Sequence, residues 1–255
     1  MTRLALALAL VLGVFPSHGA SSALTFFVLE QIDDRSAGSG PQNTLSAAER
    51  AAGWRLLFDG TTTKGWRGFA KPDFPAAGWV VEDGTLKSLG QKGGDIITTA
   101  TFDDFEFAWE WRLSPRGNSG VKYFVDERRG NEGGAIGHEY QTIDDDNYTM
   151  MLLTALQKTG AWYDVLPPTA AAARPVGSFN QSRLVVRGTI VEHWLNGTLV
   201  LRYDITSPEA AAGIAKSKFK DVKGFADKIR TPILLQDHDT VAWFRNVKIR
   251  ELPAS

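Results

Sequence analysis

Side chains of the kinds that move protons and hold hydroxyl groups recur in two short segments of this chain. In HEYQTID, the period of two along a strand would place Glu139 and Gln141 on one face. In LLQDH, Gln236 and His238 share a face. A merely solvated sheet face usually shows Lys, Glu, Thr and Ser instead. Because carboxylate and imidazole groups exchange protons and amides orient hydroxyls, the two segments favour chemistry on a polyhydroxylated ligand.

Other catalytic and metal-binding motifs are missing from the sequence. It contains no H-E-x-x-H, no P-loop, no G-x-G-x-x-G after a strand and no G-x-S-x-G. The run Asp144-Asp145-Asp146 lacks the spacing of an EF-hand, and a solvated turn explains it better. With no Cys there is no thiolate nucleophile, disulfide or Cys-ligated zinc.

Composition excludes two classes of partner. The 255 residues are 43% hydrophobic and 22% charged, which is typical of a folded globular chain. Lys and Arg total 28 against 29 Asp and Glu, so the net charge is -1. We therefore expect no nucleic acid partner and no attraction to an anionic membrane, since both depend on clustered cations.

The first residues predict export. In residues 2–20, Arg3 precedes an apolar run from Leu4 to Phe15, and small residues follow. This is the layout of a secretory signal peptide, which we place at residues 1–20, and the run is too short for a stable membrane anchor. We expect a periplasmic or extracellular protein with no integral membrane span after cleavage. Without a Cys it also has no site for a lipid anchor.

The elements that must position the polar residues are mostly short strands. Residues 21–44 are linker-like, Thr44 or Ser46 could cap a short helix, and only 208–228 also looks helical. Phe105, Phe107, Trp109 and Trp111 alternate with polar or small residues, which predicts a strand with one aromatic face. Turns are expected at Arg187-Gly188 and Asn196-Gly197. The pattern predicts one all-β domain over residues 45–253, a sandwich or jelly roll.

Ten segments, in order, carry a resemblance to a known family. They are GWRLLFDGTTTKGW, GWVVEDGTL, GGDIITT, FEFAWEWRLSPRGNSGV, GHEYQTID, TGAWYDVLPP, RPVGSFNQSRLVVRG, EHWLNG, LLQDH and FRNVKIREL. Between Leu45 and Leu252 the chain resembles the 3-keto-disaccharide hydrolase domain family. The resemblance implies a concanavalin A-like jelly-roll sandwich of two antiparallel sheets, with short helices at the periphery. It also implies exported bacterial proteins that act on glycosides whose C3 hydroxyl has been oxidised to a ketone.

The reaction implied by the resemblance is an elimination followed by hydration. A C3 ketone acidifies the hydrogen on C2, because the carbanion is delocalised as an enolate. The glycosidic oxygen on C1 lies β to the ketone and can then be expelled, and water adds to the enone. Such a site needs a base near C2, a proton donor for the leaving oxygen and a stabiliser for the enolate.

The site residues implied by this chemistry fall into three groups. Glu139 and His238 are the candidates for proton transfer, with the roles of acid and base left open, and together with a nearby Asp they could hold a divalent metal ion. The candidates for binding hydroxyls or the enolate oxygen are Arg112, Asn118, Gln141 and Gln236. The candidates for lining the sugar site are Trp162, Tyr163 and Asp164.

The sequence departs from the family pattern at three positions. Lys122-Tyr123-Phe124 stands where an Arg is usual, Phe179 where Trp is common, and Asp239 where Gly is common. Two other functions stay open. One is a non-catalytic carbohydrate-binding module, because folds of this kind host both binding and catalysis. The other is an ordinary two-carboxylate glycosidase that pairs Glu139 with Asp144 or Glu110.

Overall fold

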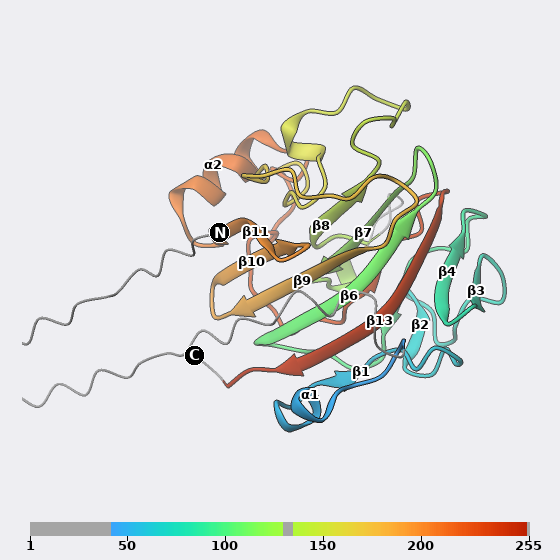
Figure 1. Ribbon diagram of the computed structural model, residues 1–255. Coiled ribbons are helices and arrows are strands. Elements are labelled where there is room, and N and C mark those ends of the chain that lie inside the picture. The colour runs from blue at the N-terminus through green and yellow to red at the C-terminus, as the bar shows by residue number, and fades with distance from the viewer. Residues whose placement is uncertain (1–41, 130–134, 254–255) are drawn as a thin grey trace, which may run out of the picture. The chain divides into compact units, whose positions relative to one another are not determined.

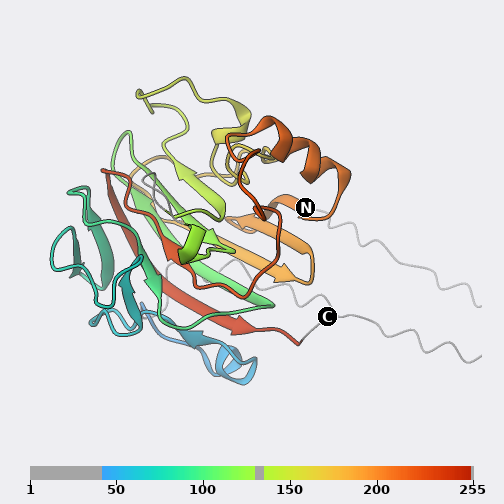
Figure 2. The same ribbon diagram turned by 180° about the vertical axis from the view of Figure 1, so that it is seen from behind.

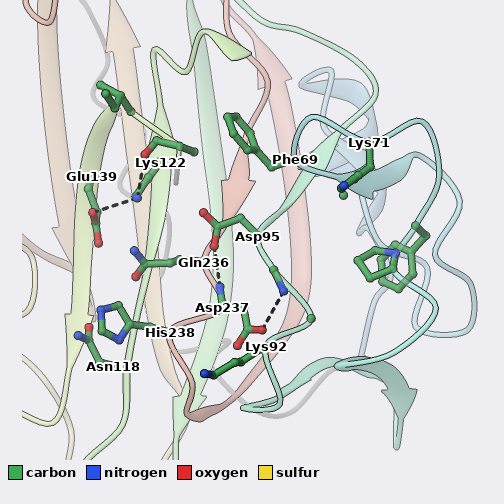
Figure 3. Close-up of a pocket in the computed structure, with 18 of the residues that line it drawn as sticks. Phe69, Lys71, Lys92, Asp95, Asn118, Lys122, Glu139, Gln236, Asp237 and His238 are labelled. Carbon is green, nitrogen blue, oxygen red and sulfur yellow. Dashed lines mark hydrogen bonds and ion pairs between the residues drawn. The ribbon is translucent and has the colours of Figure 1, made fainter. Parts of the chain in front are cut away.

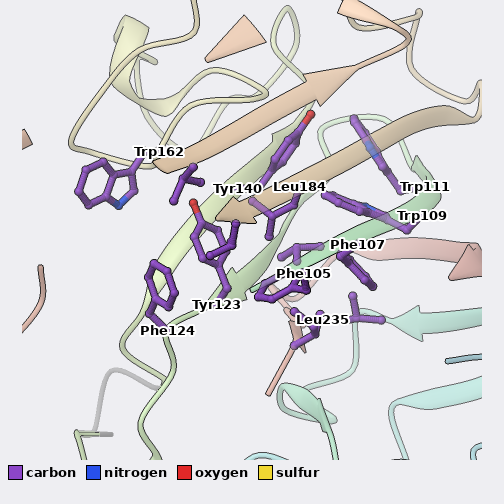
Figure 4. Close-up of a cluster of buried hydrophobic side chains, with 14 of the residues drawn as sticks. Phe105, Phe107, Trp109, Trp111, Tyr123, Phe124, Tyr140, Trp162, Leu184 and Leu235 are labelled. Carbon is purple, nitrogen blue, oxygen red and sulfur yellow. The ribbon is translucent and has the colours of Figure 1, made fainter. Parts of the chain in front are cut away.

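The alternating aromatic run forms the centre of the core. In the computed structural model, which describes residues 42–129 and 135–253, the run lies in strand β6 (Phe105–Leu113). Its four aromatic side chains are between 0% and 3% exposed. Trp109 packs edge-on against Tyr140 of the opposite sheet, with ring centroids 5.1 Å apart. The aromatic face of β6 therefore fills the space between two sheets (Figure 4).

Two antiparallel sheets form the sandwich, as expected (Figures 1 and 2). Within the described residues the larger sheet has the order β11-β10-β9-β6-β13-β4-β3, with β1 paired to β13. Its other strands are β1 (Arg55–Leu56), β3 (Trp79–Glu82), β4 (Thr85–Leu89), β9 (Asn180–Arg187), β10 (Ile190–Leu195), β11 (Thr198–Asp204) and β13 (Val241–Glu251). The smaller sheet has the order β2-β5-β12-β7-β8. Its strands are β2 (Trp66–Gly68), β5 (Ile96–Thr98), β7 (Asn118–Tyr123), β8 (His138–Ile143) and β12 (Leu234–Leu235).

Both predicted hairpins form, and one turn lies slightly later than expected. Arg187 pairs with Ile190, so the residues between β9 and β10 are Gly188 and Thr189. Between β10 and β11 the turn is Asn196-Gly197, whose φ angles are 48° and 82°. Asn and Gly tolerate this left-handed conformation best, which explains why the pair makes a tight turn.

Helices are short and lie at the edges of the sandwich (Figure 1). Helix α1 (Ala47–Ala51) begins at Ser46, whose hydroxyl accepts from the Glu49 amide while the Glu49 carboxylate accepts from the Ser46 amide. Single-turn 3₁₀ helices occupy Glu127–Arg129 and Ala155–Gln157. No helix in the described part of the chain is long and apolar enough to cross a membrane.

Helix α2 (Pro208–Lys216) ends well before residue 228, where the helical pattern was expected to stop. Ser217 ends it, because its hydroxyl donates to the Ile214 carbonyl and accepts from the Phe219 amide. The chain then forms turns, in which Phe219 stacks on Phe225 with ring centroids 4.3 Å apart.

Two buried histidines lie between the sheets. His138 Nε2 donates to the Phe225 carbonyl over 2.9 Å, and His193 Nδ1 donates to the Gly160 carbonyl over 2.9 Å. Two tyrosine hydroxyls connect them: that of Tyr123 lies 2.7 Å from His193 Nε2 and 2.7 Å from the Tyr203 hydroxyl, which lies 3.0 Å from His138 Nδ1. Burial lowers the pKa of His138 to about 3 and that of His193 to about 4. Both rings are therefore neutral at physiological pH.

Candidate active site

A cleft of about 1080 Å³ lies over the outer face of the smaller sheet (Figure 3). Its volume is slightly above the usual range for small-molecule sites, which is about 300–1,000 Å³. The floor comes from β7, β8 and the segment after β12, and the sides come from loop residues within 69–77, 92–95, 135–137 and 218–222 and from Tyr163. The floor residues are Asn118, Lys122, Glu139, Gln141, Gln236, Asp237 and His238. The side residues include Phe69, Lys71, Phe74, Lys92, Asp95, Tyr163, Lys218 and Phe219.

Successive side chains of strand β8 point to opposite faces of the sheet, as the period of two predicts. His138 and Tyr140 are fully buried in the core. Glu139 and Gln141 face the other way and line the cleft, and they are only 6% and 1% exposed. Glu139 is therefore a deep floor residue rather than a surface carboxylate.

Strand β7 supplies the other half of the floor. Asn118, Gly120 and Lys122 are two residues apart and so share a face, and Asn118 and Lys122 line the cleft. Lys122 pairs in register with Glu139, and Gly120 with Gln141. A Cβ at Gly120 would lie 2.5 Å from Glu139 Oε1, so glycine at this position leaves room for the carboxylate.

Lys122 is a site residue that the sequence analysis did not single out as such. It is 8% exposed, its Nζ lies 3.7 Å from Glu139 Oε2, and it donates to the Ala135 carbonyl over 3.1 Å. Two signals were available in the sequence. Lys122 follows Asn118 at an even spacing, and an Arg is usual near this strand end in the family.

Asp237 holds the segment that carries Gln236 and His238. Strand β12 ends at Leu235, and the Asp237 carboxylate accepts hydrogen bonds from Ser88 Oγ (2.9 Å) and the Gly94 amide (3.1 Å). The Asp237 amide donates to Asp95 Oδ1 over 3.0 Å. These contacts hold the loop that follows β12 in place. Figure 3 shows Gln236 beside Glu139, and His238 beside Asn118.

Two buried acceptor atoms on the cleft residues have no partner among the described residues. They are Asn118 Oδ1 and Gln236 Oε1. Asn118 Nδ2 donates to the Tyr148 hydroxyl over 3.3 Å, which orients the amide. Because a buried polar atom without a hydrogen bond is costly, both oxygens are candidates to accept hydrogen bonds from a ligand.

Charge and burial shift the pKa values of two side chains at the sides of the cleft, Asp95 and Tyr163. Burial raises the pKa of Asp95, although the nearby Lys122 ammonium opposes the rise. Burial, together with the charge of Glu139, raises the pKa of Tyr163 to about 12. Tyr163 therefore keeps its proton at physiological pH and can donate to a ligand oxygen.

Trp162, expected to line the sugar site, lies in the core instead. It is fully buried and stacks on His138 and Tyr203, with centroids 4.1 and 4.4 Å away. Neighbouring side chains in an extended segment point to opposite faces, so Tyr163 reaches the cleft and Trp162 cannot. Asp164 also lies outside the cleft, where it accepts from Gln157 Nε2 (3.1 Å) and the Lys218 amide (2.7 Å).

Arg112, expected to bind hydroxyls, belongs to the wrong sheet for that role. It lies on β6 of the larger sheet, with its guanidinium 4.2 Å from the Trp243 ring centroid and 4.9 Å from that of Phe179. The cleft is on the smaller sheet, so Arg112 does not line it.

The carboxylates considered as partners for Glu139 also lie elsewhere. Glu110 is on the larger sheet and accepts from Arg245 Nε (2.7 Å) and Asn246 Nδ2 (2.8 Å). Asp144 accepts from the amides of Arg116 (2.8 Å) and Asn147 (3.1 Å), so it stabilises a turn. Within residues 42–129 and 135–253, no three His, Asp or Glu side chains gather in a way that could hold a metal ion.

Comparisons with known proteins find a family and several relatives for this chain. Residues 53–250 match the family described as a 3-keto-alpha-glucoside-1,2-lyase-like domain. A 3-keto-disaccharide hydrolase from Bacteroides thetaiotaomicron is 30% identical over 248 residues, which cover 86% of this chain and 85% of the relative. A structure from Parabacteroides distasonis, named as a candidate glycosyl hydrolase, is 32% identical with a TM-score of 0.75 and covers 83% of this chain and 100% of its own. A second structure from that species has 24% identity, a TM-score of 0.62 and coverage of 78% and 99%, and shares the fold. The chain therefore belongs to the 3-keto-alpha-glucoside-1,2-lyase-like domain family.

Proposed function

We propose that this protein cleaves glycosidic bonds of 3-keto-glycosides or 3-keto-disaccharides by elimination across C1 and C2, followed by hydration. Family membership and a relative named for hydrolysis of 3-keto-disaccharides support a glycoside-cleaving enzyme. The observation that carries the proposal is the floor of the cleft. It combines one deeply buried glutamate, a lysine beside it and two unpartnered amide oxygens.

Glu139 and His238 differ in burial, and in this proposal the buried residue is the base and the exposed one is the acid. Glu139 is 6% exposed and lies on the floor, where it removes the C2 proton as a carboxylate. His238 is exposed at the edge of the cleft, where it donates a proton to the departing C1 oxygen. The electron pair of the C2–H bond is first delocalised into an enolate with the C3 ketone, and collapse of this enolate forms the C1–C2 double bond as the C1–O bond breaks. Water then adds at C1 and a proton returns to C2, so the sum is hydrolysis.

Amide groups hold the sugar in the same scheme. Asn118 Oδ1 and Gln236 Oε1 accept hydrogen bonds from substrate hydroxyls, and Gln141 lies beside them on the floor. These contacts fix the C2–H bond relative to Glu139. Correct placement of reacting groups can contribute several kcal/mol to catalysis, of order 7–11 in well-oriented systems.

The test compares a 3-keto-glycoside with its unoxidised parent, using purified protein and the Glu139→Gln and His238→Ala variants. We expect cleavage of the keto substrate alone and a loss of at least about 100-fold in kcat for Glu139→Gln. Cleavage of the parent would indicate an ordinary glycosidase, and binding of either sugar without turnover would indicate a carbohydrate-binding module. Full activity in both variants would place the chemistry at other residues.

Export belongs to the proposal as well. The predicted secretory leader lies in residues 1–20, outside the described residues. Expression of the whole chain in a bacterial host, followed by fractionation and N-terminal sequencing, should give an exported product that begins between Gly19 and Ala23. An intact N-terminus in the cytoplasm would contradict it.

A further inference from the structure

A buried ammonium group lies next to the proposed base. Lys122 is 8% exposed, and its cross-strand neighbour Glu139 is 6% exposed. The nitrogen is 3.7 Å from Glu139 Oε2, which is within ion-pair range but longer than a hydrogen bond. Burying two charges costs free energy that a pair of this length does not fully recover, so the arrangement is poorly explained by stability alone.

The hydrogen-bond donors of Lys122 are only partly used. An ammonium group has three N–H donors. One donates to the Ala135 carbonyl over 3.1 Å, and a second faces the Glu139 carboxylate. Since Lys122 lines the cleft, the third donor is available to a ligand there.

The proposed reaction requires a group in this place. When C2 loses its proton, negative charge develops on the C3 oxygen, and ordinary bond lengths put these two atoms about 2.4 Å apart. The group that binds this oxygen must therefore lie within a few Å of the base. Lys122 satisfies that condition, whereas Arg112 is on the other sheet, and Lys71, Lys92 and Lys218 are exposed at the sides of the cleft.

We propose that Lys122 is a catalytic residue that orients the Glu139 carboxylate and donates a hydrogen bond to the C3 oxygen as the enolate forms. This inference rests on the proposed function. Glu139 takes the C2 proton, and the electron pair of that bond moves into a C2–C3 double bond while the C3=O π pair moves onto oxygen. Lys122 keeps its own proton throughout and stabilises the oxyanion by a charged hydrogen bond. When the enolate collapses, the C3 ketone reforms and the C1–O bond breaks.

The decisive experiment separates enolate formation from cleavage. A 3-keto-1,5-anhydroalditol has the ketone and the C2 hydrogen but no exocyclic leaving group on C1. In D₂O, the enzyme should exchange its C2 hydrogen for deuterium, which NMR measures directly. For the wild type, Lys122→Met, Lys122→Arg and Lys122→Ala, this exchange rate is measured together with kcat and KM for cleavage of a 3-keto-glycoside. Lys216→Met, at the exposed end of α2, is the control.

We expect Lys122→Met to lose about 100- to 1,000-fold in both kcat and exchange rate, with KM changed less than about threefold. Lys122→Arg should recover at least tenfold over Lys122→Met, and added methylamine should partly restore Lys122→Ala, which a misfolded variant would not show. The control should keep wild-type rates.

Two results would overturn the inference while leaving the proposed function in place. One is wild-type exchange in Lys122→Met. The other is equal loss in all three Lys122 variants with no rescue by methylamine. If instead the wild-type protein neither cleaves the 3-keto-glycoside nor exchanges the C2 hydrogen, the proposed function itself has failed.

Discussion

Adding one methyl group at Gly120 should move the proposed base without disturbing the fold. A Cβ at this position would lie 2.5 Å from Glu139 Oε1, 3.0 Å from Cγ and 3.1 Å from Cδ. All three contacts are with the flexible side chain of Glu139, and Gly120 is not among the residues with a left-handed backbone. Alanine is therefore compatible with the strand, and the carboxylate must shift to make room.

The size of the effect follows from the overlap. Ordinary contact begins near 3.4 Å, so an Oε1 at 2.5 Å must retreat by about 1 Å. A misplacement of about 1 Å in a catalytic group can lower the rate by about 100-fold, which corresponds to about 2.7 kcal/mol of transition-state stabilisation. The free energy of unfolding should change by less than about 1 kcal/mol, because replacing Gly with Ala in a strand is itself slightly favourable.

A double-mutant cycle identifies the route of the effect. The assay is kcat/KM on a 3-keto-glycoside for the wild type, Gly120→Ala, Glu139→Gln and the double variant, with urea unfolding of each. If Gly120→Ala acts by displacing Glu139, it should cost about 100-fold in the wild type and less than about twofold in the Glu139→Gln background. Undiminished activity in Gly120→Ala, or fully additive losses in the cycle, would refute the reasoning.

Three further predictions concern the core and the loop around the cleft. Between pH 7 and pH 5 the two buried histidines should lower the free energy of unfolding by about 4 kcal/mol. The unfolded histidines take up protons below pH 6.5, whereas His138 (pKa about 3) and His193 (pKa about 4) stay neutral in the fold. Urea unfolding at several pH values tests this, and a flat profile from pH 7 to 5 would contradict it. Trp162→Phe should lower the free energy of unfolding by roughly 1–3 kcal/mol and leave KM within twofold, because the ring is buried. A large rise in KM at unchanged stability would instead indicate that Trp162 contacts the sugar. Asp237→Ala should lower kcat about tenfold and the free energy of unfolding by roughly 1–3 kcal/mol, because it leaves two donors unpaired, and unchanged kinetics would show that the loop holds its place without the carboxylate.

Local patterns were enough to predict several of the strands and part of the floor of the cleft. The period of two identified the aromatic face of β6 and placed Glu139 and Gln141 together on one face of β8. The tight turn at Asn196-Gly197 and the Ser46 capping box were also readable, because each depends on residues at most a few positions apart.

The sequence pattern did not predict which sheet, or which side of the sandwich, a given residue belongs to. The period of two along β6 puts Arg112 and Glu110 on one face, but it does not state to which sheet that face belongs. A segment outside the strands, such as the one carrying Trp162 and Tyr163, has no long run of alternation from which to tell its inner from its outer side.

The sequence by itself determined the all-β class, the faces of individual strands and the pairing of a carboxylate with amides on one of them. Only the tertiary structure decided which faces meet around one cleft. It placed Lys122 against Glu139 and tied Asp237 to Ser88, a residue 149 positions away. The physical reason is that strand periodicity is set by the local backbone, whereas the packing of two sheets depends on contacts between residues far apart in the chain.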